Sequence, residues 1–149
     1  MEILIRNLAE KDLQGLKELY RGFWGEESDI GKMEAIFGRL ERNEDYLLLV
    51  AEVDGVLAGS VQGVVCYELY GACRPFLVME NLIVDDDFQH RGIARQLIRR
   101  LEELAEQRGC YQMLFITEED RSGAVRFYEK RGFNSRSHVG FKRAIGLKQ

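Results

Sequence analysis

The sequence predicts an α/β fold in which helices pack on both faces of a mixed β-sheet. Three observations lead to this prediction: apolar runs typical of strands alternate with amphipathic segments, an Asp54-Gly55 pair separates two strand-like runs, and the chain has 149 residues. A chain of this length can bury one sizeable core. We therefore expect residues 1–149 to form a single domain.

The N-terminal half begins with a strand, predicted over residues 3–6. Apolar residues at helical spacing predict helices over 11–23 and about 32–42, separated by turn residues. Two strands follow, over 46–53 and 56–66, and the Asp54-Gly55 turn between them is typical of tight hairpins. These two strands are therefore expected to pair antiparallel.

The C-terminal half continues with an apolar strand over 76–84, a helix from Ile93 to Arg108, a strand over 111–117 and a helix near 122–131. One or two further strands are expected before the chain ends. The order is thus β-α-α-β-β-β-α-β-α-β, which predicts a mixed sheet. The exposed strand expected at the C-terminus offers an edge through which two copies could pair as a homodimer.

Composition excludes several classes of protein. Hydrophobic residues make up 46% and charged residues 31%, and no apolar run approaches the roughly 20 residues that cross a bilayer. The start lacks the basic and apolar stretches of a secretion signal, so we expect a cytoplasmic protein without a membrane partner. The net charge of −4 disfavours nucleic acid as a partner. Cys66, Cys73 and Cys110 form no C-x-x-C pair, which indicates neither a disulfide framework nor a metal site.

The turn between the strand over 76–84 and the following helix ends in Gly92. A helix start presents unpaired N–H groups and the positive end of the helix dipole, and a residue without a side chain lets a phosphate approach them. The turn is therefore a candidate anion site. The alternative is that Gly92 serves only the backbone geometry of the turn.

Two motifs occur in the C-terminal half of the sequence, and the first contains this turn. Gln89-x-x-Gly92-x-Ala94 resembles the pyrophosphate loop of the GNAT family of N-acetyltransferases, and the segment 124–133 resembles the second signature helix of that family. The resemblance implies an acyl-CoA N-acyltransferase fold whose central strands, here 76–84 and 111–117, splay around the cofactor. It also implies that acetyl-CoA is the co-substrate, that no metal is needed, and that a small molecule or a peptide supplies the primary amine that accepts the acetyl group.

The resemblance and the helix-start argument together assign the cofactor site to the end of the strand, the glycine turn and the start of the second signature helix. The candidate residues are Leu82, Ile83, Val84, Gln89, His90, Arg91, Gly92, Ile93, Ala94, Arg95, Arg121 and Ser122. We expect main-chain N–H groups to hold the pyrophosphate. The His90 side chain is expected to be solvated. Arg121 stands where the family usually has an asparagine that contacts the cofactor.

Three arginines, Arg91, Arg95 and Arg99, are spaced four residues apart and share one helix face near the helix start. Positive charge is unfavourable there, and a cofactor phosphate would offset that cost. The alternative is a solvated basic face whose arginines pair with Asp87, Glu102 or Glu103.

Two residues are candidates for catalysis. By the resemblance, Tyr128 is the general acid that protonates the departing thiolate; a phenol of ordinary pKa about 10 is protonated at neutral pH. The alternative is a core tyrosine whose hydroxyl bonds a carbonyl. Glu80 interrupts an apolar strand with Val78 and Leu82 on its own face, and such surroundings raise the pKa of a carboxyl group toward the range of a base. Glu80, directly or through water, would deprotonate the amine; a structural ion pair or contact with the acceptor is the alternative.

The acceptor pocket has no signature in the sequence. Weaker candidates for it are Asn81, the acidic residues Glu118, Glu119 and Asp120, which could instead cap the next helix, and the side chains of Phe23, Trp24, Tyr67, Tyr70 and Arg74. We predict an N-acetyltransferase that acts by direct attack in a ternary complex. The second hypothesis, motivated by Arg121, is a non-catalytic acyl-CoA-binding regulatory module.

Overall fold

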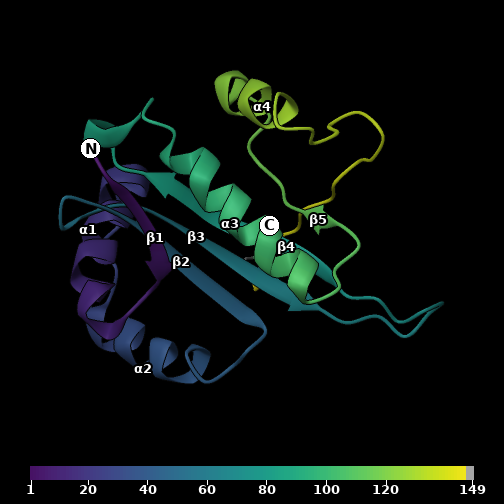
Figure 1. The fold of residues 1–149 in the computed structure, drawn as a ribbon, viewed down its shortest axis with the longest axis horizontal. Helices are drawn as coiled ribbons and strands as arrows, with labels where there is room; N and C mark the ends of the chain where they lie inside the picture. Colours follow the sequence, from purple (N-terminus) through teal and green to yellow (C-terminus); the bar gives the residue numbers. More distant parts are fainter. Residues whose placement is uncertain (147–149) are drawn as a thin grey trace. The chain divides into compact units, whose positions relative to one another are not determined.

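The computed structural model of the protein describes residues 1–146, which form two compact units, Met1–Leu114 and a second unit that begins at Phe115. The first unit contains a five-stranded sheet with the strand order β1-β2-β3-β4-β5 (Figure 1). Strands β1 to β4 pair antiparallel, and β5 pairs parallel to β4, which confirms the mixed sheet. The strands are β1 Ile3–Asn7, β2 Tyr46–Val53, β3 Val56–Cys66, β4 Phe76–Val84 and β5 Met113–Leu114.

The β2–β3 hairpin turns at Asp54 and Gly55, whose φ angles are 49° and 81°. Positive φ at both central residues is typical of the two-residue turn that matches the twist of antiparallel strands. The predicted hairpin and the bounds of both its strands are thus confirmed.

Three helices belong to the first unit: α1 Leu13–Trp24, α2 Ile30–Leu40 and α3 Ile93–Gln107. Helix α1 ends at Gly25, which adopts the left-handed conformation. Helix α2 begins after Asp29, whose carboxylate accepts a 3.0 Å hydrogen bond from the Lys32 N–H. No helix in residues 1–146 has the length and apolar character needed to span a membrane.

The two faces of the sheet carry different helices, and Figure 1 shows α3 lying over one face and running along β4. A β-carbon added to Gly63 of β3 would lie 2.6 Å from Leu101 Cδ1 of α3, so this residue faces α3. Ser60 points to the other face, where its side chain hydrogen-bonds to Tyr20 of α1. The prediction of helices on both faces is therefore confirmed. The core side chains that are almost completely buried include Leu49, Leu77, Ile93, Leu97, Ile98 and Leu101.

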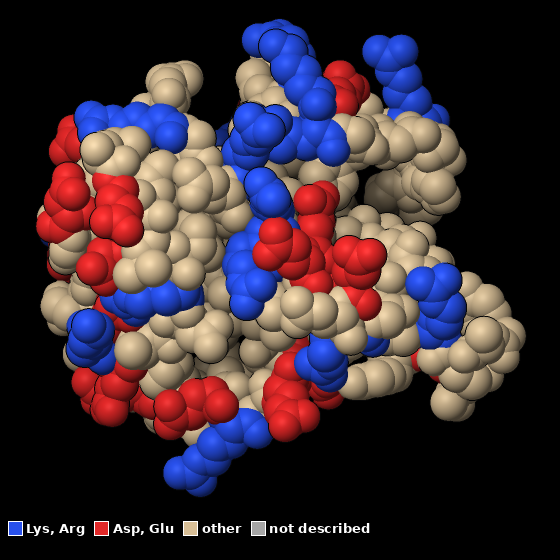
Figure 2. Space-filling model, viewed as in Figure 1, with Lys and Arg blue, Asp and Glu red and all other residues tan. Residues whose placement is uncertain are grey.

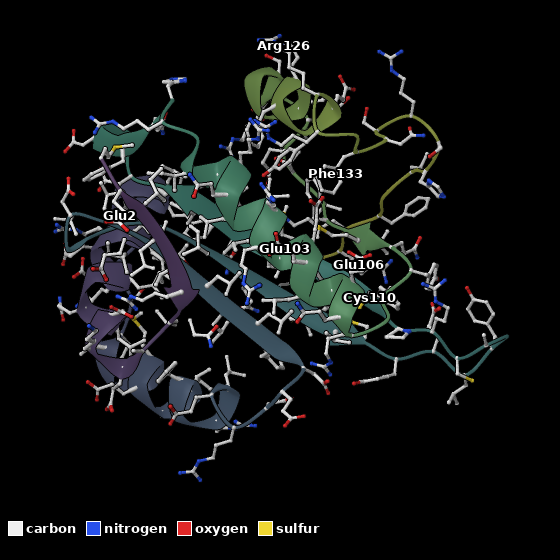
Figure 3. The ribbon with its side chains drawn as sticks, viewed as in Figure 1. Glu2, Glu103, Glu106, Cys110, Arg126 and Phe133 are labelled. Atoms are coloured by element: carbon white, nitrogen blue, oxygen red, sulfur yellow. The ribbon has the colours of Figure 1, made fainter. Side chains whose placement is uncertain are left out.

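The second unit contains helix α4 Ser122–Glu129. The chain leaves this helix through Gly132, whose φ of +88° is the left-handed conformation common at helix ends. The ring of Phe133, labelled in Figure 3, follows this helix. It packs edge-on against the ring of Phe115 in the same unit, with 4.9 Å between ring centres.

Two predictions about the C-terminal strands are wrong. The strand predicted over 111–117 is paired only at Met113 and Leu114, and residues 130–146 contain no strand. Strand-like patterning becomes a strand only where a neighbouring backbone supplies a ladder, and the apolar side chains of Val139, Phe141 and Ile145 remain exposed. The described residues therefore lack the C-terminal edge on which the homodimer was predicted.

Candidate active site

Strand β4 contains a bulge near its end. Ser60 pairs with Ile83 but Gln62 pairs with Glu80, so both Asn81 and Leu82 stand opposite one residue of β3. Asn81 has a φ of +55°, a left-handed conformation that is uncommon outside glycine but tolerated by asparagine. On the other edge of β4, the ladder to β5 ends at the Val78–Leu114 pair. Beyond that pair, β4 continues to Val84 without a ladder partner on this edge among the described residues.

The predicted cofactor segment of β4 follows this bulge. Ile83 is buried, whereas Leu82 and Val84 are half-buried. The strand ends where the Asp85 N–H donates a 2.9 Å hydrogen bond to the Ala58 carbonyl of β3. The main chain of residues 82–84 therefore leads directly into the glycine turn.

The glycine turn is held by its own side chains. The Asp85 carboxylate accepts a 2.8 Å hydrogen bond from the Asp87 N–H, and Gln89 Nε2 donates a 2.8 Å bond to Asp86. His90 and Gly92 have φ angles of 61° and 81°, so the chain turns twice through the left-handed region. The His90 side chain is exposed, as predicted.

Helix α3 opens with unpaired main-chain donors. The Gln96 N–H makes a 3.1 Å bond to the Gly92 carbonyl. The N–H groups of Ile93, Ala94 and Arg95 precede that bond and have no acceptor within the helix. Gly92, the residue before the helix, has no side chain to cap them. The predicted anion site is therefore present as backbone geometry: free donors, the positive end of the helix dipole and an open approach.

The arginines on α3 differ in their surroundings. The guanidinium carbon of Arg91 lies 5.4 Å from the centre of the Phe88 ring. Arg95 and Arg99 line a depression of about 460 Å³ that reaches Gly92. Arg99 Nε lies 3.3 Å from Glu103 Oε1. This ion pair agrees with the alternative prediction, in which the arginines of this face pair with nearby carboxylates. No ion pair joins Arg95 to a carboxylate within residues 1–146, so its charge is available beside the free N–H groups.

Figure 2 shows Lys, Arg, Asp and Glu side chains intermixed over α3. The same Glu103 that pairs with Arg99 also lies 3.2 Å from Arg100, and Figure 3 labels it midway along the helix. The positive charges of Arg99 and Arg100 are therefore neutralised by Glu103, whereas the charge of Arg95, nearer the start of α3, is not.

Glu80 is exposed, which corrects the prediction of apolar surroundings. The prediction assumed strict alternation along β4, which would put Leu82 on the face of Glu80. Because of the bulge, Ile83 shares that face instead, and it packs with Leu16 and Leu19 of α1. Glu80 pairs in register with Gln62, so both side chains point to the α1 face of the sheet.

Tyr128 lies on α4 in an aromatic cluster. Its ring centre is 4.4 Å from that of Phe115 and 5.9 Å from that of Phe133. Burial raises the pKa of the Tyr128 phenol above its usual value, and the positive charge of Arg121 partly opposes this shift. Within residues 115–146 the Tyr128 hydroxyl makes no hydrogen bond. The second unit therefore does not provide the carbonyl partner expected if Tyr128 were only a core tyrosine. The phenol is therefore protonated at neutral pH.

Arg121 and Ser122 are exposed at the start of α4. The Arg121 N–H bonds to the Glu118 carbonyl at 3.2 Å, and no side chain caps this helix. The acidic residues 118–120 are exposed and do not cap α4 with their carboxylates; Glu118 lies 3.8 Å from Lys142. Figure 3 shows Arg126 of the same helix pointing outward.

The structure thus brings the β4 segment, the glycine turn and Glu80 together in the first unit. Tyr128, Arg121 and Ser122 belong to the second unit. Within residues 1–146 no three His, Cys, Asp or Glu side chains gather as a metal site.

One feature was not predicted as a cavity: a groove of about 590 Å³ between α1, α2 and the sheet. Trp24, one of the candidate acceptor residues, lines it, but Phe23 does not. Tyr67 and Tyr70 lie elsewhere, where they bond to Asp45 and Tyr111, respectively. The amphipathic spacing of both helices indicated their buried faces, but the gap between those faces depends on tertiary packing.

Comparison with known proteins identifies the family. Residues 13–133 match the model of the acetyltransferase (GNAT) family, and the match includes both motifs. An acetyltransferase of Yersinia enterocolitica is 34% identical over 97 residues, which are 65% of this chain and 64% of that protein. The chain thus spans just under two thirds of that relative's length.

Two further relatives cover nearly the whole chain. An aminoglycoside N(6')-acetyltransferase type 1 of Salmonella enteritidis is 24% identical over 93% of this chain and 97% of its own. The solved structure of aminoglycoside N-acetyltransferase AAC(6')-Iy in complex with CoA superimposes with a TM-score of 0.81 at 21% identity, over 97% of this chain and 95% of its own. This likeness confirms the predicted fold class. The chain belongs to the acetyltransferase (GNAT) family.

Proposed function

We propose that this protein transfers the acetyl group of acetyl-CoA to a primary amine in a ternary complex. The observation that carries the proposal is the start of α3, where free N–H groups and Gly92 follow the end of β4. The names of its relatives, which include acetyltransferases and a CoA complex, support the same activity.

The cofactor would lie along β4 and across the glycine turn. N–H groups from Gln89 to Ala94 hold the pyrophosphate, and the unpaired charge of Arg95 adds attraction for phosphate. The main chain of Leu82 to Val84 lies alongside the acyl-bearing arm, on the edge of β4 that β5 leaves without a ladder. Arg121 and Ser122 contribute from the start of α4.

The chemistry needs one base and one acid. The neutral amine attacks the thioester carbonyl, its nitrogen forms the amide bond, and Glu80 takes the amine proton directly or through water. The C–S bond breaks, and Tyr128 gives its proton to the departing thiolate. The raised pKa of Tyr128 keeps that proton available at neutral pH. Direct attack needs no enzyme thiol.

Residues 1–149 would act as one catalytic domain, because the family match runs from the first unit into the second. The second candidate function, a regulatory module that binds acyl-CoA without turnover, is favoured by one observation. Arg121 occupies the position where the family resemblance leads us to expect an asparagine.

The test incubates the purified protein with acetyl-CoA and a panel of primary amines, and follows thiol release and product mass. We expect release of one thiol for each acetylated amine. Tight binding of acetyl-CoA in a calorimeter with no product from any amine would instead favour the regulatory module. Absence of acetyl-CoA binding would contradict both functions.

A further inference from the structure

The groove between α1, α2 and the sheet is mostly apolar. Trp24 of α1, Met33 and Ile36 of α2 and Leu48 of β2 contribute to its walls, and its volume of about 590 Å³ suits a small ligand. Trp24 and Ile36 are about half exposed, at 51% and 47%, so the groove is open to an incoming molecule. Large apolar side chains at an open groove favour a ligand with an apolar body.

A row of three residues links this groove to the candidate base. Leu48, Gln62 and Glu80 pair in register across β2, β3 and β4, so their side chains share one face of the sheet. Leu48 and Gln62 line the groove, and Glu80 is the next residue in the row. An amine whose apolar body lies in the groove can therefore direct its nitrogen past Gln62 toward the Glu80 carboxylate.

Three carboxylates line the groove, and two of them have other partners: Glu27 lies 3.2 Å from Lys17, and Asp29 caps α2 through the Lys32 N–H. Within residues 1–146 only the third, Glu26, has no ion pair or hydrogen bond of its side chain, and the positive charge of Lys32 in the same lining offsets one of the negative charges. A polyhydroxylated polyamine needs several unpaired carboxylates and many hydrogen-bond partners, because each desolvated polar group left unpaired costs free energy. The apolar walls do not supply them.

We propose that the acceptor is a monoamine with an aromatic or apolar body, of the arylalkylamine class, which occupies this groove with its nitrogen toward Glu80. This proposal rests on the proposed function. It differs from the substrate class that the names of two relatives indicate, aminoglycosides.

The first experiment compares kcat/KM for 2-phenylethylamine, the aminoglycoside kanamycin, spermidine and a short peptide that begins with Phe. We expect 2-phenylethylamine to be at least about tenfold better than each of the others, since burial of one aromatic ring accounts for a factor of that size. Equal or better acetylation of kanamycin, spermidine or the peptide would overturn the proposal while it upholds the N-acetyltransferase.

Trp24→Ala tests the groove itself, with Val56→Ala as its control. Both side chains are exposed to the same degree, at 51% and 52%, but only Trp24 lines the groove. We expect Trp24→Ala to raise KM for 2-phenylethylamine about tenfold through the lost aromatic contact, and Val56→Ala to change it less than about twofold. Equal effects of the two variants on KM would overturn the proposal.

Calorimetry separates the proposal from the function on which it rests. In the presence of CoA, 2-phenylethylamine should bind the wild type, and Trp24→Ala should weaken this binding whether or not turnover occurs. Binding without acetylation would support the groove and contradict the enzyme. Acetyl-CoA binding with no detectable binding of 2-phenylethylamine would overturn the groove alone.

Discussion

Gly59 of β3 lies so close to Ile83 of β4 that a β-carbon on Gly59 would be 2.9 Å from the Ile83 carbonyl oxygen. The same β-carbon would be 3.1 Å from Cγ2 of Ile93, the first residue of α3. The missing side chain therefore lets the strands and α3 approach each other directly beneath the glycine turn. We expect Gly59→Ala to reduce the free energy of unfolding by about 1–3 kcal/mol through overpacking, measured by urea denaturation.

The control for this variant is Gly22→Ala in α1, where a new β-carbon has no atom within 4 Å. In a helix this change should stabilise the protein by about 0.4–1 kcal/mol, because alanine restricts the unfolded chain. A Gly59→Ala protein with the same free energy of unfolding as the wild type would contradict this prediction, because it would show that the strands and α3 can move apart without loss of stability.

Gly92→Ala tests the anion site. Gly92 and Gly109 flank the two ends of α3, with φ angles of +81° and +75°, and a β-carbon at either position meets no atom within 4 Å. Both alanine variants should lose about 1–2 kcal/mol of stability from left-handed strain. Only Gly92→Ala should also weaken acetyl-CoA binding, by about tenfold or more in calorimetry, because the new methyl group obstructs the approach to the N–H groups. Equal acetyl-CoA affinities of the two variants would contradict the assignment.

Tyr128→Phe tests the general acid. Removal of the hydroxyl leaves the ring contacts with Phe115 and Phe133 in place, so stability should be retained while kcat falls about 10²-fold. The acid acts only when protonated, so its contribution declines as pH rises through a pKa above the usual value of about 10. The kcat–pH profile of the variant should lack this alkaline decline. Tyr46→Phe, on β2 and outside the linings of both cavities, is the control and should match the wild type.

Asp12→Asn should change how stability depends on pH. Arg6 donates hydrogen bonds of 2.7 and 2.9 Å to the buried Asp12 carboxylate, and these bonds, with one from the Ala9 N–H, lower the pKa of Asp12. A carboxylate with a lowered folded pKa stabilises the protein above its unfolded pKa of about 3.9, and this stability is lost as pH falls through the lower folded value.

We therefore expect Asp12→Asn to cost about 1–3 kcal/mol at pH 7 in urea denaturation, and the loss of stability below about pH 4 to be shallower than in the wild type. Glu10→Gln, at an exposed position of the same turn, is the matched control and should leave both quantities unchanged. An unaltered acid slope in the Asn variant would assign the acid sensitivity to other carboxylates.

Local signals allowed much of the fold to be predicted from the sequence. The bounds of β2, β3 and β4 match the prediction because a tight turn and apolar periodicity are properties of neighbouring residues. The length of β5 and the bulge at Asn81 could not be read in this way, because both are set by pairing with another strand. The turn that ends in Gly92 could be predicted for the same reason as the hairpin, because neighbouring residues in the sequence determine it.

The surroundings of Glu80 depend on which residue of β3 stands opposite it, and therefore on register. The groove beside Trp24 exists because two helices and the sheet leave space between them. Neither relationship is encoded in a short segment. The sequence therefore indicated Glu80 and Trp24 as candidate site residues but did not indicate what surrounds them.

The short β4–β5 ladder also bears on how the protein should be handled. Past Val78, one edge of β4 carries main-chain groups that no strand of residues 1–146 bonds in a ladder. An unpaired edge of this kind is a template for pairing with other chains and hence for aggregation. A bound acyl-CoA would both shield that edge and favour the folded state by mass action. Purification in the presence of CoA should therefore lengthen the shelf life of the protein in solution.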